Sequence, residues 1–313
     1  MNTTSLSLPS FAKINWSLRV LGKRPDGYHE VITVLQTVSL RDELTFTLRD
    51  DNQIVVHCDD RAIPTNESNL IVKAGRALGK YLQSWRGAEI TLTKRIPSRG
   101  GLGGASSNAA VTLLALNALW EGALKLEHLR LISRDLGSDV PFFLTGGRSI
   151  AIGTGTTVKA LHDPPKQHLI IITPKAGVST ASAYASLNAR SLTTSEAASI
   201  LSSSLADVLS ADSRQLPLCN DFERVIFEIE PEIERAKTAL LEAGARGALL
   251  AGSGSSVFGV FENETARDHA LESLKCEAGW RAFSCETISR DEYVRAMNSS
   301  GFPLLRSLKT ANR

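Results

Sequence analysis

The sequence predicts an α+β protein made of two domains. Segments in which apolar and polar residues alternate, as in paired strands, are mixed with longer segments of helical periodicity. The tripeptide Asp163-Pro164-Pro165 indicates a connection between domains, because two successive prolines interrupt both helix and strand. We therefore expect one domain over residues 1–163, a second over residues 166–298, and a tail over residues 299–313.

The first expected element is a strand over residues 13–20, where apolar and polar side chains alternate. A period of two places Lys13 and Asn15 on the same face of that strand. The sequence Arg-Pro-Asp-Gly at residues 24–27 predicts a turn. Three further strands are expected in the first domain, over residues 44–48, 54–58 and 90–92.

The helices are predicted from periodicity and from their terminal residues. Asn69 can cap a helix that begins at Leu70, and Gly137 can end another. Helices are expected over residues 106–120, 125–136, 231–243 and 265–276, with a loop-flanked helix in the serine-rich stretch 191–204. Strands of the second domain are expected over residues 168–173, 248–251, 257–261 and 283–288. From residue 291 onward only a loop at 299–303 is expected, and no role is assigned.

Composition and charge argue against several classes of protein. The chain has 35 basic and 33 acidic residues, without the basic excess typical of proteins that bind nucleic acids or membrane surfaces. Its apolar stretches are too short to span a bilayer, and its N-terminus lacks the pattern of a secretory signal. The four cysteines are scattered and form no Cys-x-x-Cys pair, which predicts reduced thiols, no zinc or redox site, and a cytoplasmic protein.

The clearest indication of a binding site is the glycine-rich segment over residues 97–110, PSRGGLGGASSNAA. Its four glycines allow backbone amides to approach a phosphate closely, and the helix that follows presents free amides and a positive dipole end. It is not a Walker A loop, because it lacks the Lys-Ser/Thr pair, and it is not a Rossmann fingerprint. A flexible surface loop is the alternative, but the flanking strand and apolar helix favour phosphate binding.

This segment resembles the phosphate loop of the GHMP superfamily, which is named after galactokinase, homoserine kinase, mevalonate kinase and phosphomevalonate kinase. Residues 12–15 (Ala-Lys-Ile-Asn) resemble the first motif of that superfamily, and residues 252–256 (Gly-Ser-Gly-Ser-Ser) resemble the C-terminal motif that closes over the nucleotide phosphates. Ala105 departs from the glycine that many relatives have there. Arg99 is also unusual before the glycines, and its side chain contacts either phosphate or only solvent.

The resemblance implies the two-domain GHMP kinase fold, with an N-terminal α/β domain like that of ribosomal protein S5 and a C-terminal ferredoxin-like α+β domain. It also implies ATP as a substrate, with Mg²⁺ carried by the nucleotide rather than by a protein metal site. Asn69 and Lys94 would lie on the adenine side, although Asn69 is equally a helix cap. The ATP-binding residues implied in the loop are Pro97, Gly100, Gly101, Leu102, Gly103, Gly104, Ala105, Ser106 and Ser107.

Residues 13–18 followed by 24–29, residues 106–110 and residues 136–141 resemble the branch of the superfamily whose substrate is a cytidine diphosphate sugar alcohol. The implied reaction is ATP-dependent phosphorylation of the 2-hydroxyl of that alcohol, in the non-mevalonate route to isoprenoid precursors. Tyr28 and His29 would hold the cytosine, Thr180 and Tyr184 would form a second wall, and Asn15 would hydrogen-bond the substrate. The alternative for Tyr28 and His29 is a tyrosine packed at a turn beside a surface histidine.

Phosphoryl transfer to an alcohol needs a base for the hydroxyl proton and positive charge near the developing negative charge. By resemblance, Asp139 is that base, and Lys13 orients it and lowers the pKa of the attacking hydroxyl. Taken alone, Asp139 is better explained as a helix N-cap, because Val140, Pro141 and Phe142 follow it. Lys13 taken alone is a solvated lysine on an exposed strand face.

Two rival functions stay open at this point. The first is another GHMP kinase of the homoserine or mevalonate type, whose substrate has no pyrimidine for Tyr28 and His29 to stack on. The second is a non-catalytic nucleotide-binding protein, which would need neither Lys13 nor Asp139. The expected partners are small molecules and not nucleic acid or membrane, and the chain is expected to be a monomer or a weak homodimer.

Overall fold

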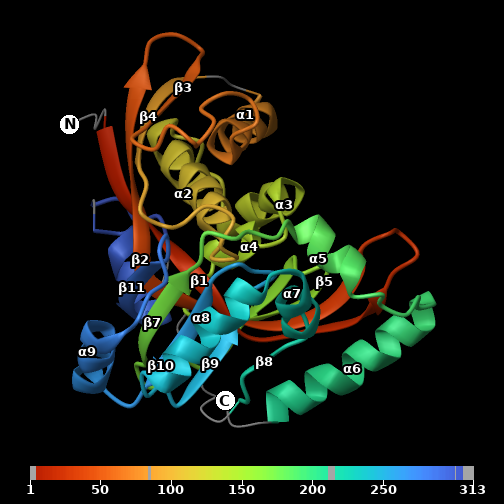
Figure 1. Ribbon diagram of the computed structural model, residues 1–313. Coiled ribbons are helices and arrows are strands. Elements are labelled where there is room, and N and C mark those ends of the chain that lie inside the picture. Colours follow the sequence, from red (N-terminus) through yellow and green to blue (C-terminus); the bar gives the residue numbers. More distant parts are fainter. Residues whose placement is uncertain (1–4, 84–85, 211–215, 300, 306–313) are drawn as a thin grey trace.

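The computed structural model describes residues 5–83, 86–210, 216–299 and 301–305. Within these residues the strands form two sheets, one of seven strands and one of four. Figure 1 shows both sheets, with helices on their outer faces. The first sheet comprises β1 (Ser5–Lys23), β2 (His29–Arg49), β3 (Ile54–Cys58), β4 (Gly87–Thr93), β5 (Arg148–Gly153), β6 (Thr157–Ala160) and β8 (Cys219–Asn220). The second comprises β7 (His168–Thr173), β9 (Gly247–Leu250), β10 (Val257–Phe261) and β11 (Arg281–Glu286).

The long antiparallel hairpin of β1 and β2 organises the first sheet. Its register runs from the Lys23–His29 pair at the predicted turn to the Ser5–Thr47 pair at its far end. The strand expected over residues 44–48 was therefore predicted too short. Residues 30–38 of β2 are buried without interruption, so both faces of the strand are covered there and its sequence shows no alternation.

Helices α1 (Leu70–Leu82), α2 (Gly104–Leu119), α3 (Leu126–Leu136) and α4 (Val140–Phe143) pack on one side of the first sheet. Figure 1 shows this group beside the upper part of the β1–β2 hairpin. Helix α2 lies at its centre and is buried along most of its length, which explains its nearly continuous apolar sequence. It begins at Gly104, two residues before the predicted start.

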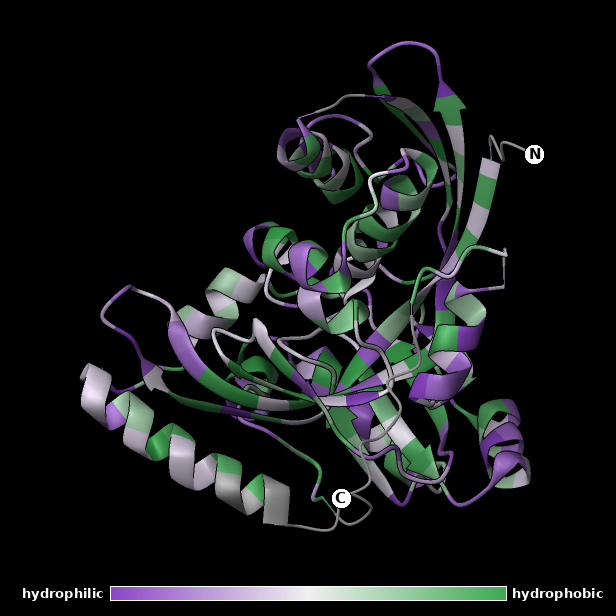
Figure 2. Cartoon of the chain, turned by 180° about the vertical axis from the view of Figure 1, so that it is seen from behind, coloured by the Kyte–Doolittle hydropathy of each residue, from purple (hydrophilic) through white to green (hydrophobic). Residues whose placement is uncertain are grey.

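The second sheet has the order β11-β7-β10-β9. Helices α8 (Pro231–Glu242) and α9 (Glu264–Ser273) pack on one face of it, and its other face meets the first sheet. An apolar cluster between the two sheets joins Ile14 and Val34 to Ile171 and Phe258. Figure 2 shows the apolar colour concentrated between these layers. The remaining helices are α5 (Thr180–Ser186), α6 (Thr194–Ser210), α7 (Glu223–Ile229) and α10 (Arg290–Met297).

Two later segments return to the first half of the chain. Strand β8 pairs in parallel with β1, and helix α10 packs into the first apolar core through the buried Tyr293, whose hydroxyl donates to the Phe143 carbonyl. Helix α10 was not predicted. Its sequence signal is the capping box formed by Ser289 and Glu292, which is present in the structure.

The predictions for the C-terminal tail, the domain boundaries, the cysteines and membrane spans can be compared with the structure in turn. The expected loop at residues 299–303 falls partly on residue 300, which lies outside the described residues, as do residues 306–313 of the expected tail. The domain boundaries stay a prediction. The four cysteines are free thiols. No described helix combines the length and apolarity needed to cross a lipid bilayer.

Candidate active site

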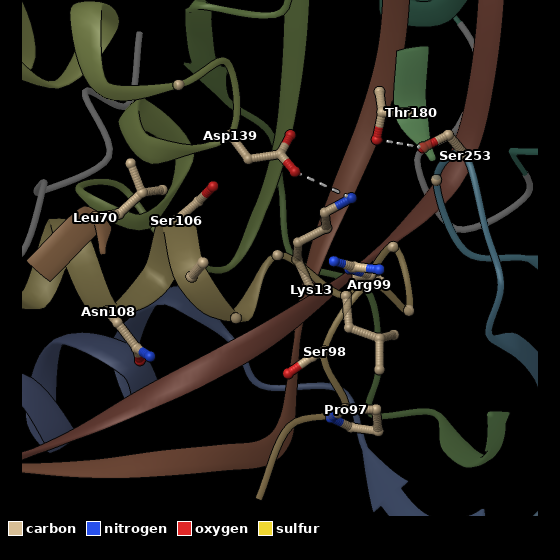
Figure 3. A pocket seen from close by; sticks show the side chains of 18 of the residues that line it. Lys13, Leu70, Pro97, Ser98, Arg99, Ser106, Asn108, Asp139, Thr180 and Ser253 are labelled. Carbon is tan, nitrogen blue, oxygen red and sulfur yellow. Dashed lines mark hydrogen bonds and ion pairs between the residues drawn. The ribbon is translucent and has the colours of Figure 1, made fainter. Parts of the chain in front are cut away.

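A cavity of about 570 Å³ lies where the two halves of the chain meet. Its wall takes Lys13 and Asn15 from β1, the glycine-rich loop before α2, and Asp139 before α4. From the later half it takes Thr180 and Tyr184 of α5, together with residues 252–253. Figure 3 shows Lys13, Asp139 and Ser106 on one side, with Thr180 and Ser253 opposite them.

The glycine-rich loop is fastened on both sides by backbone hydrogen bonds. The Lys13 amide donates to the Leu102 carbonyl at 2.9 Å, which joins the loop to β1. From the later half, the Ser256 amide donates to the Gly100 carbonyl at 3.1 Å. Gly101 and Gly103 have φ values of 73° and 72°, in the left-handed region that favours glycine. The loop is therefore a built part of the cavity wall and not a flexible surface turn.

We expect Gly101→Ala to destabilise the fold by about 2–4 kcal/mol, because a left-handed alanine is strained and the site is closely packed. A Cβ on Gly101 would lie 1.9 Å from the Ala251 carbonyl oxygen, so the two loops would have to separate. Gly27→Ala is the matched control, since Gly27 has φ of 87° but no atom within 4 Å of its added Cβ. Urea unfolding measures both variants, and equal losses of stability would contradict the packing explanation.

The end of α2 at the loop has the expected form of an anion site. The amides of the first turn of a helix have no partner within it, so those of Gly104 and Ala105 are available to a ligand. Ser106 lines the cavity. Ser107 does not, contrary to expectation: its hydroxyl is fully buried and accepts a hydrogen bond from Ser10 at 2.8 Å. The helix period turns this side chain away from the cavity and toward β1.

Lys13 and Asp139, which come from distant parts of the sequence, meet in the cavity wall. Lys13 Nζ lies 3.3 Å from Asp139 Oδ2 and donates to Asn15 Oδ1 at 2.7 Å. The lysine side chain is only 4% exposed, so the alternative of a solvated surface lysine is wrong. Asp139 stands at the N-cap position of α4, but its side chain makes no capping hydrogen bond. Its carboxylate is one-third exposed and opens to the cavity.

Asn15 is oriented by a chain of hydrogen bonds across the first sheet. Its amide nitrogen donates to Thr33 Oγ1 at 2.8 Å, and the Thr33 hydroxyl donates to the Ser17 carbonyl at 2.7 Å. The amide oxygen of Asn15 is thereby directed at Lys13 Nζ. The ammonium group also lies under the later loop, because a Cβ on Gly252 would be 3.2 Å from it. The position of Lys13 Nζ is thus held from several directions.

An aromatic group borders the opposite end of the cavity. The Tyr184 ring stacks on His29 with centroids 4.6 Å apart and meets the edge of Phe222 at 4.8 Å. Burial, with a smaller effect of the Asp139 carboxylate, raises the pKa of Tyr184 to about 12. Burial and, to a lesser extent, Lys23 lower the pKa of His29. Both rings are uncharged at neutral pH, as suits stacking on a flat ligand.

The family models match this chain on both sides of the cavity. The model described as GHMP kinases N terminal domain matches residues 69–147, and the one described as GHMP kinases C terminal matches residues 186–279. The chain belongs to the GHMP kinase family. The first match contains the glycine-rich loop and Asp139, and the second contains residues 252–256. The prediction of the GHMP kinase fold is confirmed.

Comparisons with individual relatives and solved structures identify a smaller family within the GHMP kinases. The chain is 41% identical over 286 residues to a 4-diphosphocytidyl-2-C-methyl-D-erythritol kinase of Citrifermentans bemidjiense, covering 90% of this chain and 99% of the relative. It is 40% identical over 298 residues to the enzyme of the same name from Solibacter usitatus, covering 94% and 92%. The chain therefore also belongs to the 4-diphosphocytidyl-2-C-methyl-D-erythritol kinase family.

The structural comparisons agree with this. A crystal structure of 4-(cytidine 5'-diphospho)-2C-methyl-D-erythritol kinase aligns with a TM-score of 0.72 and 32% identity, covering 90% of this chain and 99% of that one. A mevalonate kinase from L. major aligns with a TM-score of 0.69 at 14% identity, covering 92% and 99%, which shows a shared fold.

In this GHMP kinase, the side chains of the two residues expected on the adenine side both interact with other residues of the protein. Asn69 lines the cavity, but its side chain caps α1 by accepting from the Ile71 amide at 2.9 Å. Lys94 also lines the cavity, but its ammonium group pairs with Asp42 at 2.9 Å, in a site where both side chains are nearly inaccessible. Their roles toward adenine stay a prediction. Asp42 was missed, because its partner lies 52 residues away and nothing local marks it.

The residues expected around cytosine are only partly brought together in this kinase. Thr180 and Tyr184 line the cavity, and Thr180 Oγ1 lies 3.0 Å from Ser253 Oγ. His29 reaches the same group by stacking on Tyr184. Tyr28 is 66% exposed and does not line the cavity. Among the described residues, no cluster of three or more His, Cys, Asp or Glu side chains is placed to hold a metal ion.

Proposed function

We propose that this chain catalyses ATP-dependent phosphorylation of the 2-hydroxyl of 4-diphosphocytidyl-2-C-methyl-D-erythritol. The products are ADP and the 2-phosphate, on the non-mevalonate route to isoprenoid precursors. The observation that carries the proposal is the Lys13–Asp139 pair, 3.3 Å apart at a cavity whose other wall is a glycine-rich loop before a helix N-terminus. The names of the relatives support the same substrate.

In this proposal the Asp139 carboxylate accepts the proton of the 2-hydroxyl while that oxygen attacks the γ-phosphorus of ATP. The bond between the γ-phosphorus and the β,γ-bridging oxygen breaks, and ADP leaves. The Lys13 ammonium stabilises the negative charge that develops on the attacking oxygen. The loop amides and Ser106 bind phosphate oxygens. Mg²⁺ arrives with ATP and screens the charge of its phosphates.

The rival functions, homoserine kinase and mevalonate kinase, phosphorylate an acceptor that has no pyrimidine ring. Tyr184, which stacks on His29 and packs against Phe222, places an aromatic ring in the wall of the same cavity as the catalytic pair. A pyrimidine ring can stack on an aromatic side chain, whereas homoserine and mevalonate have no ring to place against it. A non-catalytic binding protein has no use for a buried lysine paired with a carboxylate in its cavity, because burying that charge is costly. Both features favour the proposed reaction.

Steady-state kinetics with Tyr184→Ala test the proposed substrate. The wild-type protein is expected to phosphorylate the cytidine diphosphate alcohol and not homoserine or mevalonate. Loss of the stacking ring in Tyr184→Ala is expected to raise KM for that alcohol about 10-fold or more, with KM for ATP unchanged. Tyr184→Phe keeps the ring and is expected to stay near the wild-type KM.

Tyr81→Ala is the control, since Tyr81 is an exposed aromatic residue of α1 outside the cavity. Phosphorylation of homoserine or mevalonate in place of the cytidine compound would overturn the assignment of substrate. A protein that binds ATP and turns over none of the three alcohols would overturn the assignment as a kinase of this type.

A further inference from the structure

The charges on the cavity wall do not cancel. Four charged side chains line it: Lys13, Lys94, Arg99 and Asp139. Lys13 pairs with Asp139 at 3.3 Å, and Lys94 pairs with the buried Asp42 at 2.9 Å. Among the described residues, Arg99 has no ion pair. It is therefore the one cation of this wall whose charge no neighbouring carboxylate offsets.

Arg99 stands within the glycine-rich loop and is exposed to the cavity. Figure 3 shows Arg99 among the side chains that line the cavity together with Lys13. Its carbonyl accepts a hydrogen bond from the Ser255 amide at 3.3 Å, which holds its backbone against the later loop. The backbone of Arg99 is thus fixed against the later loop, while its side chain is exposed in the cavity wall.

The backbone at Arg99 is unusual for an arginine. Its φ of 59° lies in the left-handed region, where a side chain is strained and glycine is not. Four of the next five residues are glycines, and a glycine at position 99 would adopt the same conformation without strain. Strained side chains of this kind persist mainly where function compensates for the strain. Backbone conformation and the uncancelled charge are two independent observations about the same residue.

We propose that Arg99 binds the phosphate groups of a nucleotide substrate and supplies a positive charge that is not offset by a paired carboxylate. The proposal rests on the proposed function, in which ATP and a cytidine diphosphate compound both bring phosphates to this cavity. Backbone amides offer these anions only neutral donors. A guanidinium group donates two parallel hydrogen bonds to a phosphate and keeps its charge at every physiological pH.

The test compares ligands with and without phosphate by isothermal titration calorimetry. Arg99→Gln is expected to bind MgATP, cytidine diphosphate or both about 10-fold more weakly, because a charge-assisted hydrogen bond is lost. Adenosine and cytidine, which have no phosphate, are expected to bind as they do to the wild type. The nucleotide whose affinity falls identifies the phosphates that Arg99 contacts. Arg99→Lys is expected to recover part of the loss, since it keeps the charge without the planar fork.

Two further variants separate charge from folding. Arg95→Gln removes the same charge four residues away, where the exposed guanidinium pairs with Asp59 outside the cavity, and is expected to leave phosphate affinity unchanged. Arg99→Gly is expected to keep or raise the midpoint of thermal unfolding, because the strain is relieved, while it weakens phosphate binding as Arg99→Gln does.

Wild-type affinity of Arg99→Gln for both phosphate ligands would overturn the proposal, as would an equal loss for adenosine or cytidine. Failure of the proposed function looks different. Suppose that the wild type does not phosphorylate the cytidine diphosphate alcohol but that its affinity for MgATP depends on Arg99. The role of Arg99 is then supported, and the proposed acceptor is wrong. If the wild type turns over the alcohol normally and Arg99→Gln binds the phosphate ligands as the wild type does, only the role proposed for Arg99 is wrong.

Discussion

Asp139→Asn is expected to lower kcat by about 100-fold to 10,000-fold, which is the contribution of a positioned general base. Asparagine has the size of aspartate, and the Asp139 side chain is one-third exposed, so the fold has no reason to change. Its amide oxygen can still face Lys13 Nζ, but it cannot hold the proton of the attacking hydroxyl. Dissociation constants of ATP and of the cytidine diphosphate alcohol should therefore stay near wild type.

Steady-state and equilibrium binding measurements on the same preparation check this expectation. Asp135→Asn is a matched control, because Asp135 is exposed at the end of α3 and does not line the cavity. If Asp139→Asn bound both substrates and kept near-normal turnover, Asp139 would not be the base. The proton would then go directly to the phosphate or to water.

Lys13→Met is expected to lower kcat by about 100-fold to 1,000-fold, the range seen when one preorganised charge or donor is removed from a transition state. Methionine fills much of the space of the lysine stem, and Asp139 is left in a partly solvated position, so the protein should still fold. The loss should appear in kcat more than in the affinity for either substrate. Circular dichroism and thermal unfolding verify the fold before the kinetics are compared.

Lys13→Arg is expected to rescue little of this loss, although it keeps the charge. Lys13 Nζ lies closely under Gly252, and its stem passes Gly103, where an added Cβ would be 3.0 Å from Lys13 Cγ. The wider guanidinium group has no room to point both at Asn15 and at Asp139. Lys159→Met, an exposed change on β6, serves as the control. Full activity of Lys13→Met would contradict the electrostatic role proposed for Lys13.

Local sequence predicted the parts of the site that depend on neighbouring residues. The four glycines of the loop predicted a conformation that Gly101 and Gly103 adopt, with φ near 70°. Alternation over residues 13–20 predicted that Lys13 and Asn15 share a face, and a 2.7 Å hydrogen bond joins them. Dihedral preference and side-chain period act over a few residues, so a short segment carries enough information to show them.

The resemblance to a family, and not local physics, selected Lys13 and Asp139 as a pair. Considered singly, each had an ordinary structural explanation, which the tertiary structure removed for Lys13 by burying it. Ser107 shows the reverse: the motif marked it, and packing against Ser10 turned its hydroxyl away from the cavity. The full length of β2 was missed because burial on both faces removes the alternation that marks a strand. Helix α10 was missed although its local capping box, Ser289 with Glu292, marks where it begins.

The chain's own sequence thus established the strand that carries Lys13, the glycine conformations of the loop, and the helix that starts behind it. The folded arrangement alone decided which charges neutralise one another: Lys13 with Asp139, Lys94 with Asp42, and Arg99 with no carboxylate among the described residues. The reason is that the energy of a charge depends on its distance from other charges and on its burial. Those quantities exist only once segments far apart in the chain have been packed together.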